Sequence, residues 1–220
     1  ILLVDKPLNW TSFDVVKKIR NEIIDHFKIK KIKVGHDGTL DPLATGLIIL
    51  CIGEKTKTAN ELIMDSKYYV GEIRLGATTP SFDLETPIDS HYDVPEINEQ
   101  VINALIKKFS GELNQVPPNY SAKRIDGKRA YDLARANQEL KLRPNKIFIK
   151  ELSLELIDDK TLSFRCKCSK GTYIRALARD IGLALNSGAF LQQLRRIKSG
   201  NFSIDQAKTV DQWIEIIKSS

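Results

Sequence analysis

The chain has 220 residues, of which 42% are hydrophobic and 28% are charged, and its 34 basic and 28 acidic side chains give a formal net charge of +6 at pH 7. This length and composition suit a globular protein that buries a full core without disulfides or metal, and they exclude a disordered or fibrous chain. The longest uninterrupted apolar run, residues 47–52, is too short to cross a bilayer, and the first residues do not form a signal peptide. We therefore expect no membrane association.

Hydrophobic periodicity and turn residues predict an irregular succession of helices and strands in the first two thirds of the chain. Residues 11–14 resemble a capping box, and apolar residues at helical spacing follow them. The predicted elements, in chain order, are a helix over 13–27, a loop over 34–42, a strand over 47–52, a helix over 55–64, a strand over 68–75, an irregular connection over 78–95 and helices over 98–109 and 130–137.

The last third predicts a hairpin over 152–157 and 162–168, and then two helices, the second over 210–218. Thr172 is predicted to cap the first helix, in which Arg175 and Arg179 lie one turn apart on a face other than the inward one. Its inward face would consist of Ile174, Leu177, Ala178, Ile181 and Leu185. Because strands and helices mix without regular βαβ alternation, we expect an α+β fold, a mixed central β-sheet flanked by helices, with an inserted arm over about 77–150.

The chemistry-bearing residues exclude several kinds of site. The three cysteines form no CxxC pair, which argues against a disulfide framework and a structural zinc site and favours a reducing cytoplasm. Cys166 and Cys168 share one strand face with Phe164, so we expect them in the core. The histidines lack metal-ligand spacing, and residues 46–55 fail the phosphate-loop pattern. The sequence therefore predicts no metal and no cofactor.

Positive charge gathers in residues 120–150, which hold nine basic and three acidic side chains, a local charge of 9 − 3 = +6. Such a stretch is usually a solvated surface. Clustered Lys and Arg interleaved with Tyr120 and Tyr131 are also typical of a nucleic-acid site.

Asp41 and His36 have ordinary interpretations on spacing alone. Asp41 before Pro42 is typical of a helix N-cap and a first-turn proline, and a single loop histidine is more often hydrogen-bonded than catalytic. However, residues 35–47 read GHDGTLDPLATGL, which is too long and unusual for a turn signal. This string resembles the GH-x-G-[AT]-LDP-x-ATG-[LM] motif of the TruB family, the bacterial tRNA pseudouridine-55 synthases.

Further segments resemble the same family in the same order along nearly the whole chain. They are LVDKP at 3–7, GEKTK at 53–57, KYY at 67–69 with RLG at 74–76, YSAK at 120–123 with GKRAY at 127–131, CSKGTYIR at 168–175 and LRR at 194–196. The resemblance implies the pseudouridine synthase fold and isomerisation of uridine to pseudouridine at position 55 in the T loop of tRNA. It also implies an enzyme that flips its target base and needs no cofactor.

The resemblance implies three catalytic residues. Asp41 matches the carboxylate that acts as nucleophile or base in breaking the glycosidic bond. Arg175 matches the arginine that would hold Asp41 ionised through a charge-assisted pair, although alone it would be a solvated helix charge. Tyr69 matches the tyrosine that stacks on the uracil, although alone it would be an ordinary strand aromatic. Asp83 resembles an acidic residue near the target base.

The resemblance also implies the residues that bind the RNA. His36 would fill or support the space that the flipped base leaves, and Tyr173 and Leu194 would form the pocket wall. The basic arm would clamp the T stem-loop, and residues 28–33 would make a second phosphate contact. The arm side chains expected to bind RNA are Lys123, Arg124, Lys128 and Arg129.

We expect one catalytic domain over 1–220 with no C-terminal RNA-binding domain of the PUA type, since only residues 201–220 follow the LRR segment. This favours a stand-alone cytoplasmic enzyme without an obligatory protein partner. Two alternatives remain open: a non-catalytic RNA-binding or tRNA-folding module on the same scaffold, and the catalytic subunit of a guide-RNA particle. The residues leave open whether Asp41 attacks C1′, adds to C6 or removes a sugar proton.

Overall fold

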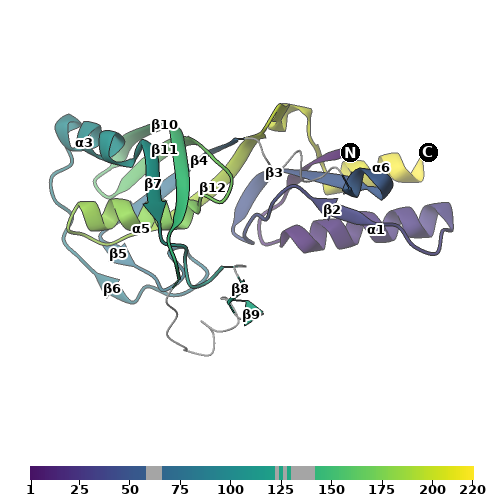
Figure 1. Cartoon of the computed structure of the whole chain (residues 1–220), viewed down its shortest axis with the longest axis horizontal. Helices are drawn as coiled ribbons and strands as arrows, with labels where there is room; N and C mark the ends of the chain where they lie inside the picture. Colours follow the sequence, from purple (N-terminus) through teal and green to yellow (C-terminus); the bar gives the residue numbers. More distant parts are fainter. Residues whose placement is uncertain (58–65, 122–123, 126–127, 130–141) are drawn as a thin grey trace. The chain divides into compact units, whose positions relative to one another are not determined.

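The computed structural model describes residues 1–57, 66–121, 124–125, 128–129 and 142–220, and the chain divides into two compact units. Unit 1 comprises Ile1–Val70 and Leu194–Ser220, and unit 2 comprises Gly71–Gln193. The chain leaves unit 1 within strand β4 (Lys67–Leu75) and returns to it within strand β12 (Ala189–Ser199). Figure 1 labels the main elements of both units.

Unit 1 is organised around strand β3 (Ala44–Ile52), whose sequence ATGLIILCI is buried almost throughout, as expected of a central strand. Strand β1 (Leu2–Lys6) pairs antiparallel with β3, whereas the end of β12 pairs parallel with it, so the sheet is mixed. Strand β2 (Val34–His36) is antiparallel to β3. Two short strands complete this sheet, β13 (Phe202–Ser203) beside β12 and β14 (Lys208–Thr209) beside β1.

Helices α1 (Ser12–Phe27) and α6 (Val210–Lys218) pack their apolar faces into the core of unit 1. Apolar residues at helical spacing on α1 meet the inward side chains of β1 and β3, which explains the orientation of α1. The buried core cluster consists of Val4, Val15, Val16, Ile19, Ile23, Ile48, Leu50, Val210, Ile214 and Ile217. The 3-10 helices are η1 (Gly53–Thr56) and η2 (Ile204–Gln206).

Unit 2 contains a sheet with the strand order β12, β4, β11 (Thr161–Cys168), β10 (Asn145–Asp158) and β7 (Gly111–Gln115). Helices α3 (Glu99–Phe109) and α5 (Ile174–Ala184) belong to the same unit as this sheet (Figure 1). Two small antiparallel pairs form separate two-stranded sheets: β5 (Ala77–Thr78) with β6 (Ser90–His91), and β8 (Arg124–Ile125) with β9 (Lys128–Arg129).

The α+β fold with its mixed sheet confirms the predicted class, and most predicted elements are present. The helices over 13–27, 98–109 and 210–218, the strands over 47–52 and 68–75, and the hairpin over 152–157 and 162–168 all occur, with shifts at some ends. Cys166 and Cys168 are buried with Phe164, as predicted. The helix predicted over 130–137 and most of that over 55–64 fall outside the described residues; Gly53–Thr56 form η1.

Four local predictions were wrong. The loop over 34–42 begins only after β2, and the connection over 78–95 contains part of the β5–β6 pair, because strands this short carry no periodic signal. Asp41 is followed by a turn and then β3, so it caps no helix. Thr172 does not cap α5: its hydroxyl donates to Ser169 O at 2.9 Å, and the N-cap residue is Tyr173, which makes no side-chain cap bond.

Gly46 illustrates how tightly β3 and β12 approach each other. Its φ is +103°, and a Cβ built there would lie 2.3 Å from Arg196 O. We expect Gly46→Ala to lower the free energy of unfolding by about 3 kcal/mol or more, because it combines backbone strain with a main-chain clash. Gly53→Ala is the matched control: Gly53 also has a positive φ, of +59°, but no atom lies within 4 Å of its built Cβ. Equal losses for both variants in urea unfolding would contradict this explanation.

Candidate active site

The loop that carries Asp41 connects β2 to β3 in unit 1 and is fixed by Asn9 and by Ser12, the first residue of α1. Ser12 Oγ accepts from Leu40 N at 2.8 Å and donates to Leu40 O at 3.1 Å, while Asn9 N donates to Pro42 O at 2.9 Å. Ala44 N donates to Asp41 O at 3.0 Å and closes the turn. The half-buried Asp41 therefore stands on a loop that is held directly before and after it.

Lys6 is fully buried beside this loop. Its Nζ donates to the carbonyl oxygens of Pro7 at 2.9 Å, Trp10 at 2.5 Å and Pro42 at 3.4 Å. Burial lowers the pKa of Lys6 from 10.5 to about 8, and the negative charge of Asp41 is the strongest influence that opposes this shift. Lys6 thus links the residues before α1 to the Asp41 turn.

The lowered pKa of Lys6 predicts a pH-dependent stability. Between pH 8 and 10.5 the unfolded chain holds a proton that the folded chain releases, so the free energy of unfolding should rise with pH across this window. Relative to Lys6→Met, we expect the wild type to gain up to about 3 kcal/mol from this group. Chemical unfolding at several pH values measures the gain. The exposed Lys18→Met should keep the wild-type slope, and a Lys6→Met protein with that slope would contradict the prediction.

His36 closes β2 immediately before the loop. Its Nδ1 lies 3.2 Å from Gly38 N and accepts the hydrogen bond from that amide. Burial lowers the pKa of His36, so the ring is neutral at pH 7. An accepting Nδ1 on a neutral ring assigns the proton to Nε2, which makes Nε2 a donor.

Three buried charged residues meet at Asp37, the first residue of the loop. Asp37 Oδ2 accepts from Lys67 Nζ at 3.1 Å, and Oδ1 lies 3.4 Å from Arg196 Nη2. Burial alone would raise the pKa of Asp37, but the charges of Arg196 and Lys67, together with hydrogen bonds from Ser199 and Ile49, hold the pKa below its ordinary value. Asp37 is therefore ionised in the interior of unit 1.

Tyr69 and Leu194 also belong to unit 1. Tyr69 is buried on β4, two residues after Lys67, so both side chains leave the same face of the strand. Leu194 pairs with Ala44 at the start of β3, and its carbonyl accepts from Thr45 Oγ1 at 3.5 Å. Unit 1 therefore contains Asp41, His36, Tyr69 and Leu194.

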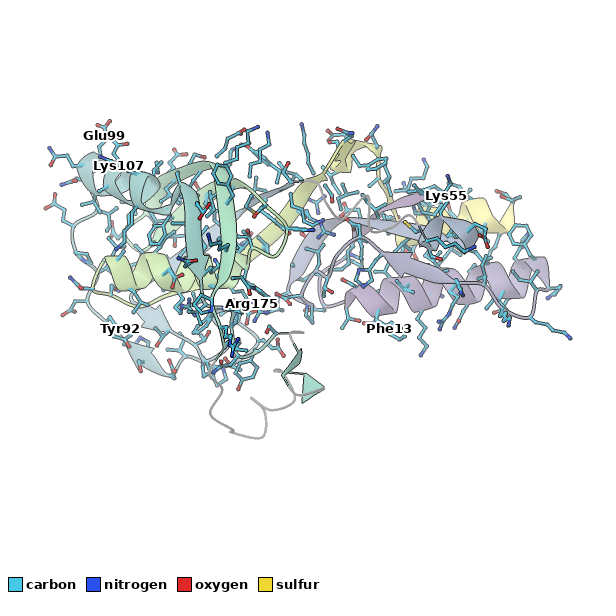
Figure 2. All side chains as sticks on the ribbon, in the orientation of Figure 1. Phe13, Lys55, Tyr92, Glu99, Lys107 and Arg175 are labelled. Carbon is cyan, nitrogen blue, oxygen red and sulfur yellow. The ribbon has the colours of Figure 1, made fainter. Side chains whose placement is uncertain are left out.

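Arg175 lies in the first turn of α5 in unit 2, where it is labelled in Figure 2. It is 4% exposed, so its interpretation as a solvated helix charge was wrong. Nη1 donates to Ser81 O at 3.0 Å, and Nε lies 3.6 Å from Oδ2 of Asp83, which is also buried. Asp83 Oδ1 in turn accepts from Glu85 N at 3.0 Å. These bonds fix the guanidinium against the 81–85 segment.

Tyr173 is held through its backbone by Gln115 of β7. Gln115 Oε1 accepts from Tyr173 N at 2.8 Å, and Gln115 Nε2 donates to Tyr173 O at 3.1 Å. This amide clamp sets the start of α5 and therefore the position of Arg175 two residues later. Gln115 carries no motif signal, and sequence reasoning missed it.

Among the predicted RNA-binding residues of the arm, Arg124 lies on β8 opposite Arg129 of β9, and Lys128 pairs with Ile125. Lys123 falls outside the described residues. Asp41 and Arg175 belong to different units, so their pairing stays a prediction. The sequence analysis did not predict that Asp37, Lys67 and Arg196 form buried ion pairs, because these residues lie far apart in the chain and their spacing follows no pattern.

The described residues contain no group of three or more side chains suited to hold a metal ion. In the same part of the chain, no helix has the length and apolar character needed to cross a membrane.

The fold is that of the pseudouridine synthases. A crystal structure of a Cbf5–Nop10–Gar1 complex matches with a TM-score of 0.73 and 27% identity, covering 97% of this chain and 53% of that chain, so the present chain spans about half of it.

Family models identify the chain more closely. The model described as "TruB family pseudouridylate synthase (N terminal domain)" matches residues 25–174, and "tRNA pseudouridylate synthase B C-terminal domain" matches residues 175–218. The chain belongs to the TruB family of pseudouridylate synthases. It is 48% identical over 215 residues to tRNA pseudouridine synthase B of Phocaeicola vulgatus, covering 98% of this chain and 92% of that protein. The protein of the same name from Bacteroides fragilis is 50% identical over 206 residues, covering 94% and 88%.

Proposed function

We propose that the chain isomerises uridine to pseudouridine at position 55 in the T loop of tRNA, in the cytoplasm and without a protein partner. Membership of the TruB family and the names of relatives close to half identical support an enzyme that forms pseudouridine in tRNA. The observation that carries the proposal is the GHDGTLDPLATGL segment, in which the residues between β2 and β3 form a loop that is fixed on both sides of Asp41.

The reaction rearranges bonds within one nucleotide. The N1–C1′ bond breaks, the uracil turns, a C5–C1′ bond forms, C5 loses its proton and N1 gains one. Because nothing is oxidised or reduced, amino-acid side chains suffice and no cofactor is required. Asp41 would act as nucleophile or base, by attack at C1′, by addition at C6 or by removal of a sugar proton.

Arg175 would stabilise the ionised form of Asp41 through a charge-assisted pair when the substrate is bound. Its orientation depends on Asp83 and Ser81, which supports a role that needs a defined guanidinium plane. Tyr69 would stack on the uracil and accept the C5 proton. Its burial on β4 suits a residue in a pocket that excludes water.

The target base must leave the T-loop stack before it can react, at a cost of a few kcal/mol. His36 would occupy or support the space that the base leaves, with Nε2–H as the donor toward the RNA. Tyr173 and Leu194 would line the pocket. Both are half-buried, as expected of wall residues that meet a substrate.

RNA binding would use the basic arm, with Lys123, Arg124, Lys128 and Arg129 on phosphates, and the four exposed lysines of residues 28–33 as a second contact. If the four arm side chains each contact a phosphate, the affinity for tRNA should fall about 10²-fold between ~50 and ~200 mM salt. Filter binding measures this fall.

Changing the four arm residues together to Gln should flatten the salt dependence and weaken binding at low salt, while saturating tRNA restores much of the turnover. Lys107→Gln with Lys108→Gln is the control and should leave the salt slope unchanged. Both lysines are exposed on α3, and Figure 2 labels Lys107. If the arm variant keeps the wild-type salt slope, the arm side chains do not contact the phosphates of tRNA.

Tritium release from tRNA labelled at uridine C5 tests the function directly, with the purified chain as the only protein. We expect release from both full-length tRNA and the isolated T stem-loop, mapped to position 55. Binding without release would favour a non-catalytic RNA-binding module. Release only after addition of a guide RNA and further proteins would favour the subunit of a guide-RNA particle.

A further inference from the structure

Around Asp37, at the start of the Asp41 loop, lies a set of polar side chains. Neither the family motifs nor the roles given above assign a function to them. Asp37, Lys67, Arg196 and Ser199 are all buried, with Asp37 and Arg196 at 0% exposure. The GH-x-G motif leaves the position of Asp37 open. Burying three charges costs free energy unless geometry and hydrogen bonds offset it, so their place in the interior needs an explanation.

Asp37 ties the start of the loop to β3 and β12. Its backbone N donates to Ile49 O at 3.1 Å, and its Oδ1 accepts from Ile49 N at 3.0 Å. Its Oδ2 accepts from Ser199 Oγ at 2.6 Å and from Lys67 Nζ at 3.1 Å. Lys67 Nζ also donates to Ser199 Oγ at 2.9 Å, which closes the cluster.

Arg196 spans the base of the loop. Its Nε donates to Leu47 O at 2.6 Å and its Nη2 donates to Gly38 O at 3.2 Å, so one planar group joins two carbonyls on either side of Asp41. The same Nη2 lies 3.4 Å from Asp37 Oδ1. Within the described part of the chain, the buried Nη1 has no hydrogen-bond partner, which costs stability. The bonds that this arginine does make join Gly38 to Leu47 across the loop.

We propose that Arg196, held by Asp37, is a positioning residue that sets the geometry of the Asp41 loop for pseudouridine formation. This inference rests on the proposed function, because the loop matters to the reaction only if Asp41 is the catalytic carboxylate. A side chain that joins Gly38 and Leu47 limits the freedom of everything between them. A small displacement of a reacting group lowers a rate strongly even when the fold is intact.

The charge balance of the cluster decides which variant separates positioning from folding. Asp37→Asn leaves Arg196 and Lys67 buried without their carboxylate, so it should lower the melting temperature strongly. Arg196→Met removes the bridge between Gly38 and Leu47 but leaves Asp37 and Lys67 as a balanced, hydrogen-bonded pair. Arg196→Met is therefore the informative variant, because the fold should survive while the loop loses its constraint.

The experiment measures single-turnover pseudouridine formation at saturating tRNA, tRNA affinity and far-UV circular dichroism, all below the melting temperature. For Arg196→Met we expect a rate lower by about 10²-fold with affinity within a few-fold of wild type. Arg196→Lys keeps the charge but lacks the planar fork, so its rate should be intermediate. Arg195→Met is the matched control: Arg195 pairs with Asp5 at 2.7 Å, is partly exposed and should retain the wild-type rate.

A folded Arg196→Met protein with a saturating rate close to wild type would overturn the inference. So would a loss confined to tRNA affinity. If Arg196→Met does not fold, a folded Arg196→Lys protein with an unchanged rate overturns it equally. Asp41→Asn in the same assay separates the two proposals: an active Asp41→Asn protein removes the proposed function, whereas an inactive one beside an active Arg196→Met protein removes only the role of Arg196.

Discussion

Replacing Asp41 by asparagine is expected to abolish detectable pseudouridine formation while tRNA affinity stays within a few-fold of wild type. An amide has nearly the shape of a carboxylate, but it is neither a nucleophile nor a base. The bonds that fix the loop run through the backbone of Leu40 and Pro42 and of Asp41 itself, so the substitution leaves them in place. Tritium release and filter binding on one preparation measure both quantities.

Asp5→Asn is the control for loss of a carboxylate in unit 1. Asp5 is only half-buried and pairs with Arg195, so its removal should leave turnover intact. Turnover by an Asp41→Asn protein that is free of host enzyme would contradict the assignment of Asp41. A large loss of tRNA affinity in the same protein would instead make Asp41 a binding residue.

Replacing Arg175 should have the second largest effect on turnover. Arg175→Ala leaves the buried Asp83 without its cation, at a cost of about 3–5 kcal/mol in stability, and removes the partner proposed for Asp41. Arg175→Lys keeps the charge but cannot donate in the plane that reaches both Ser81 O and Asp83. We expect the saturating rate of Arg175→Lys to fall about 10²-fold with little change in tRNA affinity.

The neighbouring arginine of the same helix provides the control. Arg179 donates to Val116 O at 3.0 Å and lies 4.9 Å from the centre of the Phe82 ring, so it also contacts the 81–85 segment. Arg179→Lys should retain turnover if the guanidinium of Arg175, and not the general rigidity of this segment, serves the reaction. Equal losses of turnover in the two lysine variants would assign Arg175 a structural role only. A fully active Arg175→Lys protein would do the same.

The sequence was sufficient for the parts of this protein that depend on local pattern or on a long motif. Helical spacing after Thr11 predicted α1, alternation around Cys166 predicted β11, and the all-apolar run after Gly46 predicted a buried strand. These patterns succeed because the period of an element and the side that it buries are recorded in consecutive residues. The thirteen-residue segment at 35–47 led to Asp41 and to the family for a similar reason: a segment with this many specified positions is not produced by turn chemistry alone.

Only the tertiary structure decided how charged residues are paired. Arg175 and Asp83 are separated by α3 and most of the sheet of unit 2 along the chain, yet they meet in its interior. Arg196 reaches Gly38, 158 residues earlier, because β12 returns beside β3. On spacing alone Arg175 is interpreted as a solvated charge, since burial and partners depend on strand order and not on neighbours in the chain. Strand order arises from the packing of the whole unit, which is why Asp37, Lys67 and Arg196 became a cluster only in the folded protein.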